Sequence, residues 1–161
     1  MIDSARVSPP PPGRAAVSIR DIAEPDRDAW SALFLAYGLF YETRFVPQVI
    51  DGVWAWLMDA ESDICAVVAT TGSETVGFAH YRRLPDTFTA GPSWFLDDLF
   101  VASEARGSGA GTALIEAVSE RAASDGGGTL RWITAANNAP AQRLYESVAT
   151  RTSWVTFERQ T

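Results

Sequence analysis

Hydrophobic residues in the first third of the chain alternate with polar ones or recur at helical spacing. Ala16–Arg20 alternates like a short strand. Two helical patterns follow, one after Pro25 and one from Pro47, and proline is tolerated in the first turn of a helix. The apolar residues of both patterns recur at intervals of three and four, which predicts one buried face on each helix. These residues are Trp30, Leu33, Phe34 and Tyr37 in the first, and Ile50, Val53, Trp54 and Leu57 in the second.

The rest of the chain predicts further strands and helices. Apolar runs at Ser62–Thr70 and Thr75–Leu84 are joined by a short turn and predict a hairpin. A polar loop, Pro85–Pro92, leads to a third, central strand at Ser93–Val101. The remaining elements are a helix at Gly109–Ser124 ended by glycines, a strand at Leu130–Thr134, a helix capped by Asn138 and a last strand at Trp154–Phe157. This order predicts an α/β (α+β) architecture with a single mixed sheet and helices on both of its faces.

The N-terminal segment differs in character from the rest of the chain. Residues 1–15 include Pro9–Gly13, four prolines and a glycine, which cannot form a helix or a central strand. We expect residues 1–15 to be a disordered, proline-rich tail and residues 16–161 to form a single domain. The chain length of 161 residues is typical of one domain. No apolar run approaches the roughly 18 residues of a membrane span.

The net charge, the single cysteine and the single histidine exclude several classes of partner and site. The formal net charge of -7 repels phosphate backbones, so we expect no nucleic-acid partner, although a cationic substrate would be compatible. The single cysteine, Cys65, allows no intrachain disulfide and is expected to be a small buried hydrophobe. With no signal peptide evident, the cytoplasm is the expected location. The single histidine, His80, excludes a multi-histidine metal site, and we expect it to be structural and no metal to be bound.

A glycine-containing loop between the central strand and the helix carries the first chemical signal. The loop, Ala105–Thr112, lets the backbone turn tightly and approach a ligand without a Cβ in the way. The unpaired N–H groups and the dipole at the start of the helix make an anion site, suited to a pyrophosphate. A nucleoside triphosphate loop would place lysine after its last glycine, but Gly111 is followed by Thr112 and Ala113. A dinucleotide loop would belong to the first strand–helix unit, whereas this one lies late in the chain.

Two motifs resemble those of one known family, the GNAT N-acetyltransferases. Arg106–Gly111 resembles the family's phosphate loop, and Asn138–Tyr145 resembles its Asn-x-x-Ala-x-x-Leu-Tyr helix. Leu96–Val101 is similar to a strand of the branch that contains polyamine acetyltransferases and yeast histone-acetyltransferase-like proteins. The resemblance covers about Val17 to Arg159. It implies a mostly antiparallel sheet of about six or seven strands with about four helices, in which two central parallel strands splay apart to admit acetyl-CoA.

The resemblance also implies roles for individual residues on the donor side. The backbone of Leu99, Phe100 and Val101 would bind the acetyl and pantetheine arm. Asn138 would contact the pantetheine amide, cap its helix, or do both. Tyr145 would be the general acid that protonates the leaving thiolate, with packing in its helix as the alternative. The pyrophosphate would be held by Arg106 and by the N–H groups of Gly107, Ser108, Gly109, Ala110, Gly111 and Thr112.

Two neighbouring acids are the candidates for handling the amine. Asp97 and Asp98 are adjacent in a strand, so we expect their side chains to point to opposite faces and only one to reach a given cleft. By resemblance, Asp97 is preferred as the base or amine binder, directly or through a water molecule, and Asp98 is the structural one. Tyr41 and Glu42 are further candidates for binding the acceptor, and so are Phe40 and Trp54. For each of the four, a purely structural role is an equally open alternative.

The activity that the resemblance implies is acetyl transfer from acetyl-CoA to a primary amine by direct attack in a ternary complex. A polyamine, an amino acid or another small cationic amine is the favoured acceptor. A protein amine is an alternative acceptor. A non-catalytic domain that binds acyl-CoA for regulation is an alternative to an enzyme. Relatives in this branch suggest a homodimer.

Overall fold

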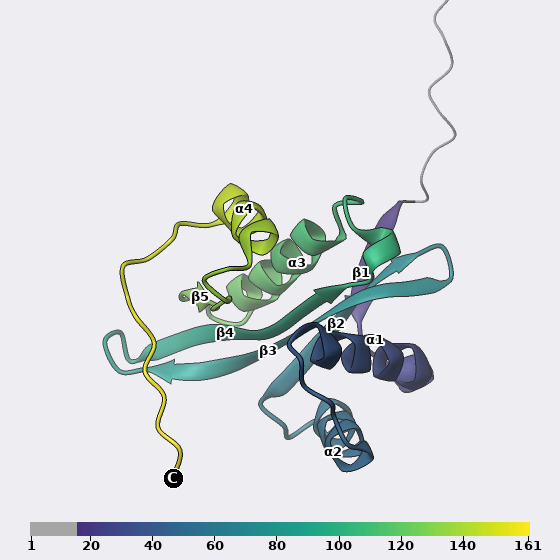
Figure 1. Cartoon of the computed structure of the whole chain (residues 1–161). Helices are drawn as coiled ribbons and strands as arrows, with labels where there is room; N and C mark the ends of the chain where they lie inside the picture. Colours follow the sequence, from purple (N-terminus) through teal and green to yellow (C-terminus); the bar gives the residue numbers. More distant parts are fainter. Residues whose placement is uncertain (1–15) are drawn as a thin grey trace, which may run out of the picture.

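The computed structural model describes residues 16–161 and places nine regular elements and two short 3-10 turns along them (Figure 1). The proline-rich stretch, residues 1–15, lies outside the described residues. The strands are β1 (Val17–Asp21), β2 (Ile64–Thr71), β3 (Glu74–Asp86), β4 (Gly91–Val101) and β5 (Leu130–Arg131). The helices are α1 (Arg27–Phe40), α2 (Pro47–Met58), α3 (Ala110–Ser124) and α4 (Ala139–Val148), with 3-10 turns at Glu24–Asp26 and Ser103–Ala105.

The five strands form one sheet in the order β1-β2-β3-β4-β5. The first three pairings are antiparallel, and β5 alone runs parallel to its neighbour, β4. The prediction of a single mixed, mostly antiparallel sheet is therefore confirmed. A parallel neighbour needs a crossover connection, and α3 provides it between β4 and β5.

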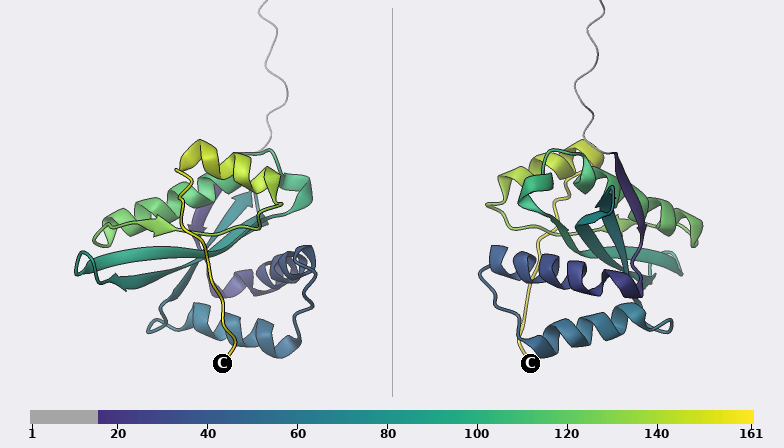
Figure 2. Two further views of the ribbon diagram at one scale, coloured as in Figure 1. Left: turned by 60° about the vertical axis from the view of Figure 1, so that its left-hand side comes forward. Right: turned by 90° about the vertical axis from the view of Figure 1, so that its right-hand side faces the viewer.

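Helices cover both faces of the sheet (Figure 2). On one face α1 and α2 bury an aromatic core, in which Trp30, Trp54 and Phe78 are nearly inaccessible. On the other face α3 packs Leu114 and Val118 against β2, β3 and β4, and α4 lies beside α3. The helical spacing of apolar residues predicted these buried faces correctly, because burial of one helical stripe is what that spacing permits.

The sheet is smaller than predicted. The strand expected at Trp154–Phe157 is wrong: the chain after α4 forms no regular element, and its large apolar side chains are exposed. The strand expected at Leu130–Thr134 is only Leu130–Arg131. A strand needs a neighbour to satisfy its backbone groups, and the sequence of a strand does not say whether one is present. The sheet accordingly has five strands within residues 16–161 rather than six or seven.

Two smaller expectations also change. The loop predicted at Pro85–Pro92 is shorter, because β3 and β4 continue as a paired hairpin to Asp86 and from Gly91. Cys65 is exposed rather than buried, because it precedes the fully covered stretch of β2, Ala66–Thr70. No helix within residues 16–161 combines the length and the apolar character needed to cross a membrane.

Candidate active site

The predicted phosphate loop lies at the N-terminus of α3, between the end of β4 and the first helical turn. Gly107 and Gly109 have φ angles of 74° and 89°, in the left-handed region that disfavours residues with a Cβ. Gly109 is the N-cap residue of α3, and the N–H of Ala110 donates a hydrogen bond to Ser108 Oγ at 3.3 Å. The first turn of an α-helix directs its backbone N–H groups out of the helix end, so this turn suits an anion such as a phosphate.

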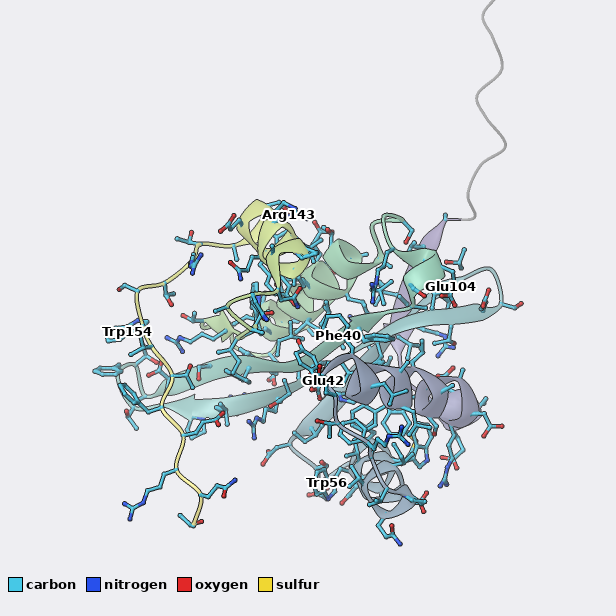
Figure 3. All side chains as sticks on the ribbon, viewed as in Figure 1. Phe40, Glu42, Trp56, Glu104, Arg143 and Trp154 are labelled. Carbon is cyan, nitrogen blue, oxygen red and sulfur yellow. The ribbon has the colours of Figure 1, made fainter. Side chains whose placement is uncertain are left out.

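Arg106 stands at the same end of the molecule. Its guanidinium lies 5.9 Å from the ring centroid of Phe40 at the end of α1, and its Nε donates to the carbonyl of Val101 at 3.4 Å. Both Arg106 and Phe40 are exposed, so the cation remains available to a ligand. Phe40 and Glu42 lie together at the end of α1 (Figure 3). The loop and Arg106 thus form one cationic, donor-rich edge, as their predicted roles require.

Within residues 16–161 the one parallel strand pair, β4 with β5, is short and leaves the end of β4 nearest this loop unpaired on one side. β4 and β5 pair at just two positions, Trp94 with Leu130 and Phe95 with Arg131. Beyond them β4 continues to Val101, and no strand within residues 16–161 pairs with that stretch on the side away from β3. The backbone of β4 in this stretch, which includes the predicted Leu99, Phe100 and Val101, therefore has an open edge that can bond an extended ligand.

A small cavity lies where α1, β4, the segment after β5 and α4 meet. Its volume is about 20 Å³, enough for one water-sized group. Tyr145 and Asp97, the predicted acid and base, both line it, and so does Tyr41, a predicted acceptor-binding residue. The other lining residues are Tyr37, Leu96, Leu99, Trp132 and Ile133. The fold therefore brings together side chains from four elements that are distant in sequence.

Tyr145 is held in this cavity by α4. Its ring makes an edge contact with Trp132 at 5.5 Å between centroids. Burial, with a smaller contribution from Tyr41, raises the pKa of Tyr145 to about 12, so the phenol carries its proton at neutral pH. Asn138 begins the same helix, and its Oδ1 accepts from the N–H of Ala141 at 3.3 Å. The helix-capping role of Asn138 is confirmed, while its contact with a pantetheine amide stays a prediction.

A β-bulge in β4 changes how the two acids are arranged. His80 pairs with Asp98 and Tyr81 pairs with Leu96, which leaves Asp97 as an extra residue without a partner on β3. An extra residue shifts the alternation of side chains by one position. Leu96 and Leu99, on either side of the acids, accordingly pack on the same face of the sheet, although three positions separate them.

The contacts of the acids show that both point toward one face. Asp97 pairs with Arg82, and Asp98 pairs with His80, each at 2.9 Å. His80 and Arg82 are two residues apart on β3 and so face the same side, which is the side covered by α1. The expectation that Asp97 and Asp98 point to opposite faces is therefore wrong, because it assumed a regular strand and the bulge breaks that regularity.

The surroundings of the two carboxylates push their pKa values in opposite directions. Burial raises the pKa of Asp97, and the negative charge of Asp98 adds to this, against the opposing effect of Arg82. Asp97 Oδ2 is buried and accepts no hydrogen bond from the described part of the chain. For Asp98, burial also acts upward, but the hydrogen bonds and charge of its neighbours prevail and leave its pKa below the usual range. Asp97 therefore takes up a proton more readily than Asp98 does.

The predicted acceptor-binding residues occupy different places. Tyr41 lines the cavity at the end of α1. Glu42 follows in a turn with φ of 56° and is exposed. Trp54 is buried against Trp30, with ring centroids 5.2 Å apart, so it is a core residue. The pattern analysis placed Tyr37 on the buried helical face and missed it as a site residue. It lies in the last turn of α1, four positions before Tyr41, and that spacing was the available signal.

No group of three or more histidine, cysteine, aspartate or glutamate side chains within residues 16–161 could hold a metal ion.

Comparisons with known proteins identify the family and the fold of the chain. Residues 21–149 match the model of the acetyltransferase (GNAT) family. The chain is 31% identical over 145 residues to a D-amino-acid N-acetyltransferase, HPA3, of Saccharomyces cerevisiae, covering 89% of this chain and 90% of that protein. It is 30% identical over 131 residues to an uncharacterized N-acetyltransferase, YhfO, of Bacillus subtilis, covering 81% and 87%. The solved structure of an aminoglycoside N-acetyltransferase, AAC(6')-Iy, in complex with CoA has the same fold, with a TM-score of 0.79 at 20% identity over 93% of this chain and 97% of that one.

Proposed function

This chain belongs to the acetyltransferase (GNAT) family and is an acetyl-CoA-dependent N-acetyltransferase, and we propose that it acetylates a small primary amine, with amino acids as the first class to test. The observation that carries the proposal is the cavity in which Asp97 and Tyr145 meet beside the open edge of β4. Direct attack by an amine on a thioester needs a base that takes a proton from the nitrogen and an acid that gives a proton to the sulfur. A carboxylate and a phenol in one cavity can supply these two functions.

The residues around the open edge of β4 fit acetyl-CoA. The first turn of α3 and the loop before it, with Gly107 and Gly109 at positive φ, suit the pyrophosphate. The backbone of Leu99 to Val101 would hydrogen-bond the pantetheine arm, and Arg106 would stand beside the phosphates. When bound, acetyl-CoA supplies an acetyl group activated as a thioester.

The two catalytic side chains would divide the proton transfers. Asp97 Oδ2, which is buried and unpartnered in the described structure, takes the proton that the acceptor's ammonium group must lose before its nitrogen can attack. The new C–N bond forms as the C–S bond breaks. Tyr145 donates a hydrogen bond, and then its proton, to the departing sulfur, so CoA leaves as the thiol. The nitrogen loses its second proton as the amide forms, and this proton returns to the Tyr145 phenolate, while the proton held by Asp97 passes to the solvent. The raised pKa of Tyr145, about 12, keeps that proton in place beforehand.

The character of the site favours a small cationic acceptor. Two carboxylates face the α1 side of the sheet, and both attract an ammonium group there. Three tyrosines, Tyr37, Tyr41 and Tyr145, line the cavity and offer hydroxyl groups to a polar substrate. The yeast relative is named for activity on D-amino acids, which places amino acids ahead of polyamines in the order of testing.

A panel of amines tests the proposal directly. Thiol release from acetyl-CoA is measured with D- and L-amino acids, polyamines, an aminoglycoside and a peptide with a free N-terminus. We expect turnover with at least one of the small amines. Turnover with the peptide alone would replace the small acceptor by a protein amine. If CoA raises the melting temperature but no amine is acetylated, the chain is a binding domain, because a ligand that binds only the native state stabilises it.

We also propose that the protein is a homodimer that uses the segment after α4. This segment runs from α4 past the sheet toward the level of α2 without forming a regular element (Figures 1 and 2), and Trp154, Val155 and Phe157 are 86%, 74% and 89% exposed. Trp154 stands far from both helical layers (Figure 3). The residues have high strand propensity, and exposed apolar clusters of this kind mark interaction sites. In a two-fold symmetric dimer, the segment after α4 of each copy would pack on the sheet of the other copy, and the exposed apolar side chains of both segments would be covered.

Light scattering on the purified protein tests the dimer. We expect twice the chain mass for the wild type and the chain mass for the double variant Trp154→Ser, Phe157→Ser. The matched control is Phe88→Ser, because Phe88 is equally exposed but lies in the turn between β3 and β4. A monomeric wild type at micromolar concentration would refute the proposal.

A cytoplasmic location completes the proposal. It is supported by Cys65, a free thiol, since proteins of reducing compartments keep their thiols unpaired. Fractionation of cells that express the chain would show it in the cytoplasmic fraction.

A further inference from the structure

The single histidine, His80, occupies a place that packing alone does not explain. Its side chain is 2% exposed and lies in the middle of β3, beneath α1. Aromatic rings surround it, with Phe78 and Phe34 at 4.6 and 5.3 Å between ring centroids. A polar imidazole in such surroundings is unfavourable unless both ring nitrogens are hydrogen-bonded.

Both nitrogens are bonded, and one of the partners decides where the ring proton sits. Trp30 Nε1 donates to His80 Nε2 at 2.9 Å. An indole N–H can only donate, so Nε2 must offer its lone pair. The ring proton of a neutral imidazole is then on Nδ1, which lies 2.9 Å from Asp98 Oδ2. Trp30 thus turns His80 into a hydrogen-bond donor aimed at Asp98.

Asp98 has a second donor on the cavity side. The hydroxyl of Tyr37 also acts on this carboxylate and lowers its pKa, as a donated hydrogen bond does. Burial, followed by the nearby charge of Asp98, raises the pKa of Tyr37, so its hydroxyl keeps its proton. Tyr37 also lines the cavity that holds Tyr145 and Asp97. Asp98 is therefore oriented from two sides, and its side chain is still 25% exposed.

We infer that His80, locked as its Nδ1–H tautomer by Trp30, is a positioning residue that holds Asp98 as the oriented anion that receives the acceptor's ammonium group. The inference rests on the proposed function, and it assigns the acids different tasks: Asp98 binds the amine and Asp97 accepts the proton. The β-bulge makes this division possible, because it turns both carboxylates toward the α1 side. Charge-assisted hydrogen bonds from His80 and Tyr37 keep Asp98 anionic and fixed.

The tautomer of His80 can be read without any activity. In the untagged protein His80 is the only histidine, so its two ring nitrogens give unambiguous signals in a long-range ¹H–¹⁵N spectrum of ¹⁵N-histidine-labelled protein. We expect a pyrrole-type shift for Nδ1 and a pyridine-type shift for Nε2. The opposite pattern, or a charged ring, would overturn the inference. This result stands even if no acceptor amine is found, so its failure and the failure of the proposed function are distinguishable.

Steady-state kinetics then tests the positioning role. His80→Leu removes the donor to Asp98, and we expect the KM for the amine to rise tenfold or more, while the KM for acetyl-CoA changes less than twofold. His80→Asn keeps an N–H near the position of Nδ1 and should recover most of the loss. A role in stability alone would lower the melting temperature of His80→Leu and leave the KM for the amine unchanged.

A double-mutant cycle adds a second readout. In the background of Asp98→Asn, His80→Leu should raise the KM for the amine no further, because the effect of His80 passes through Asp98. Additive effects would overturn the inference. If His80→Leu does not fold, Tyr37→Phe carries the same test, since it removes the other donor to Asp98 and leaves the buried network of His80 and Trp30 in place.

Discussion

Replacing Tyr145 by phenylalanine is expected to lower kcat by about a hundredfold to ten-thousandfold, the usual range for loss of a general acid. The substitution removes one oxygen and keeps the ring that packs against Trp132, so the fold of α4 should not change. The departing sulfur would then develop negative charge with no donor in the cavity. Binding of CoA, measured by calorimetry, should stay within twofold of the wild type, because the phosphate loop lies at a separate helix end.

Tyr81→Phe is the matched control for Tyr145→Phe. Tyr81 is also buried, and burial likewise raises its pKa to about 12, but it lies in the core under α3 and does not line the cavity. Its replacement should leave kcat within about twofold. A kcat of Tyr145→Phe equal to that of the control would exclude Tyr145 as the acid and leave it a packing residue.

Replacing Asp97 by asparagine is expected to have the second large effect, a fall in kcat of about a hundredfold or more. Asparagine has the size of aspartate but accepts no proton at neutral pH. The variant keeps a polar group near Arg82, so the loss should appear in kcat rather than in melting temperature. Asp63→Asn, at an exposed carboxylate just before β2, is the control and should behave as the wild type.

The pH dependence of kcat follows from the raised pKa of Asp97. A base works only when it is deprotonated, so kcat should rise with pH as Asp97 loses its proton. Because burial moves the pKa of Asp97 upward from 3.8, this rise should occur at higher pH than for an exposed aspartate. Arg82→Gln removes a cation that favours the ionised form, and should move the rise to still higher pH. A profile that Arg82→Gln leaves unchanged would argue against Asp97 as the base.

The phosphate loop shows how far local pattern reaches. Positive φ angles at Gly107 and Gly109 and the start of α3 depend on residues that are close in sequence, so the sequence predicted the loop and the start of the helix in the right place. The N-cap of α4 at Asn138 was predictable for the same reason. The acids are an intermediate case. Apolar residues on the α3 side occur at 94 and 96 and then at 99 and 101, and this step of three marks the bulge, although alternation alone suggested opposite faces.

By itself, the sequence determined most of the elements, the two buried helical faces and the glycine loop before α3. Each of these depends on periodicity or on groups a few residues apart, whereas the acid and base candidates came from the resemblance to a known family. Only the tertiary structure decided that Asp97 and Asp98 share a face, that Trp30 fixes the proton of His80, and that Tyr37 joins the cavity. These depend on contacts between α1, β3 and β4, which are distant in the sequence: 50 residues separate Trp30 from His80. The segment after α4 was mispredicted for the same reason. Trp154–Phe157 has high strand propensity, but a strand forms only where a neighbouring strand can pair with it, and the local sequence does not specify that neighbour.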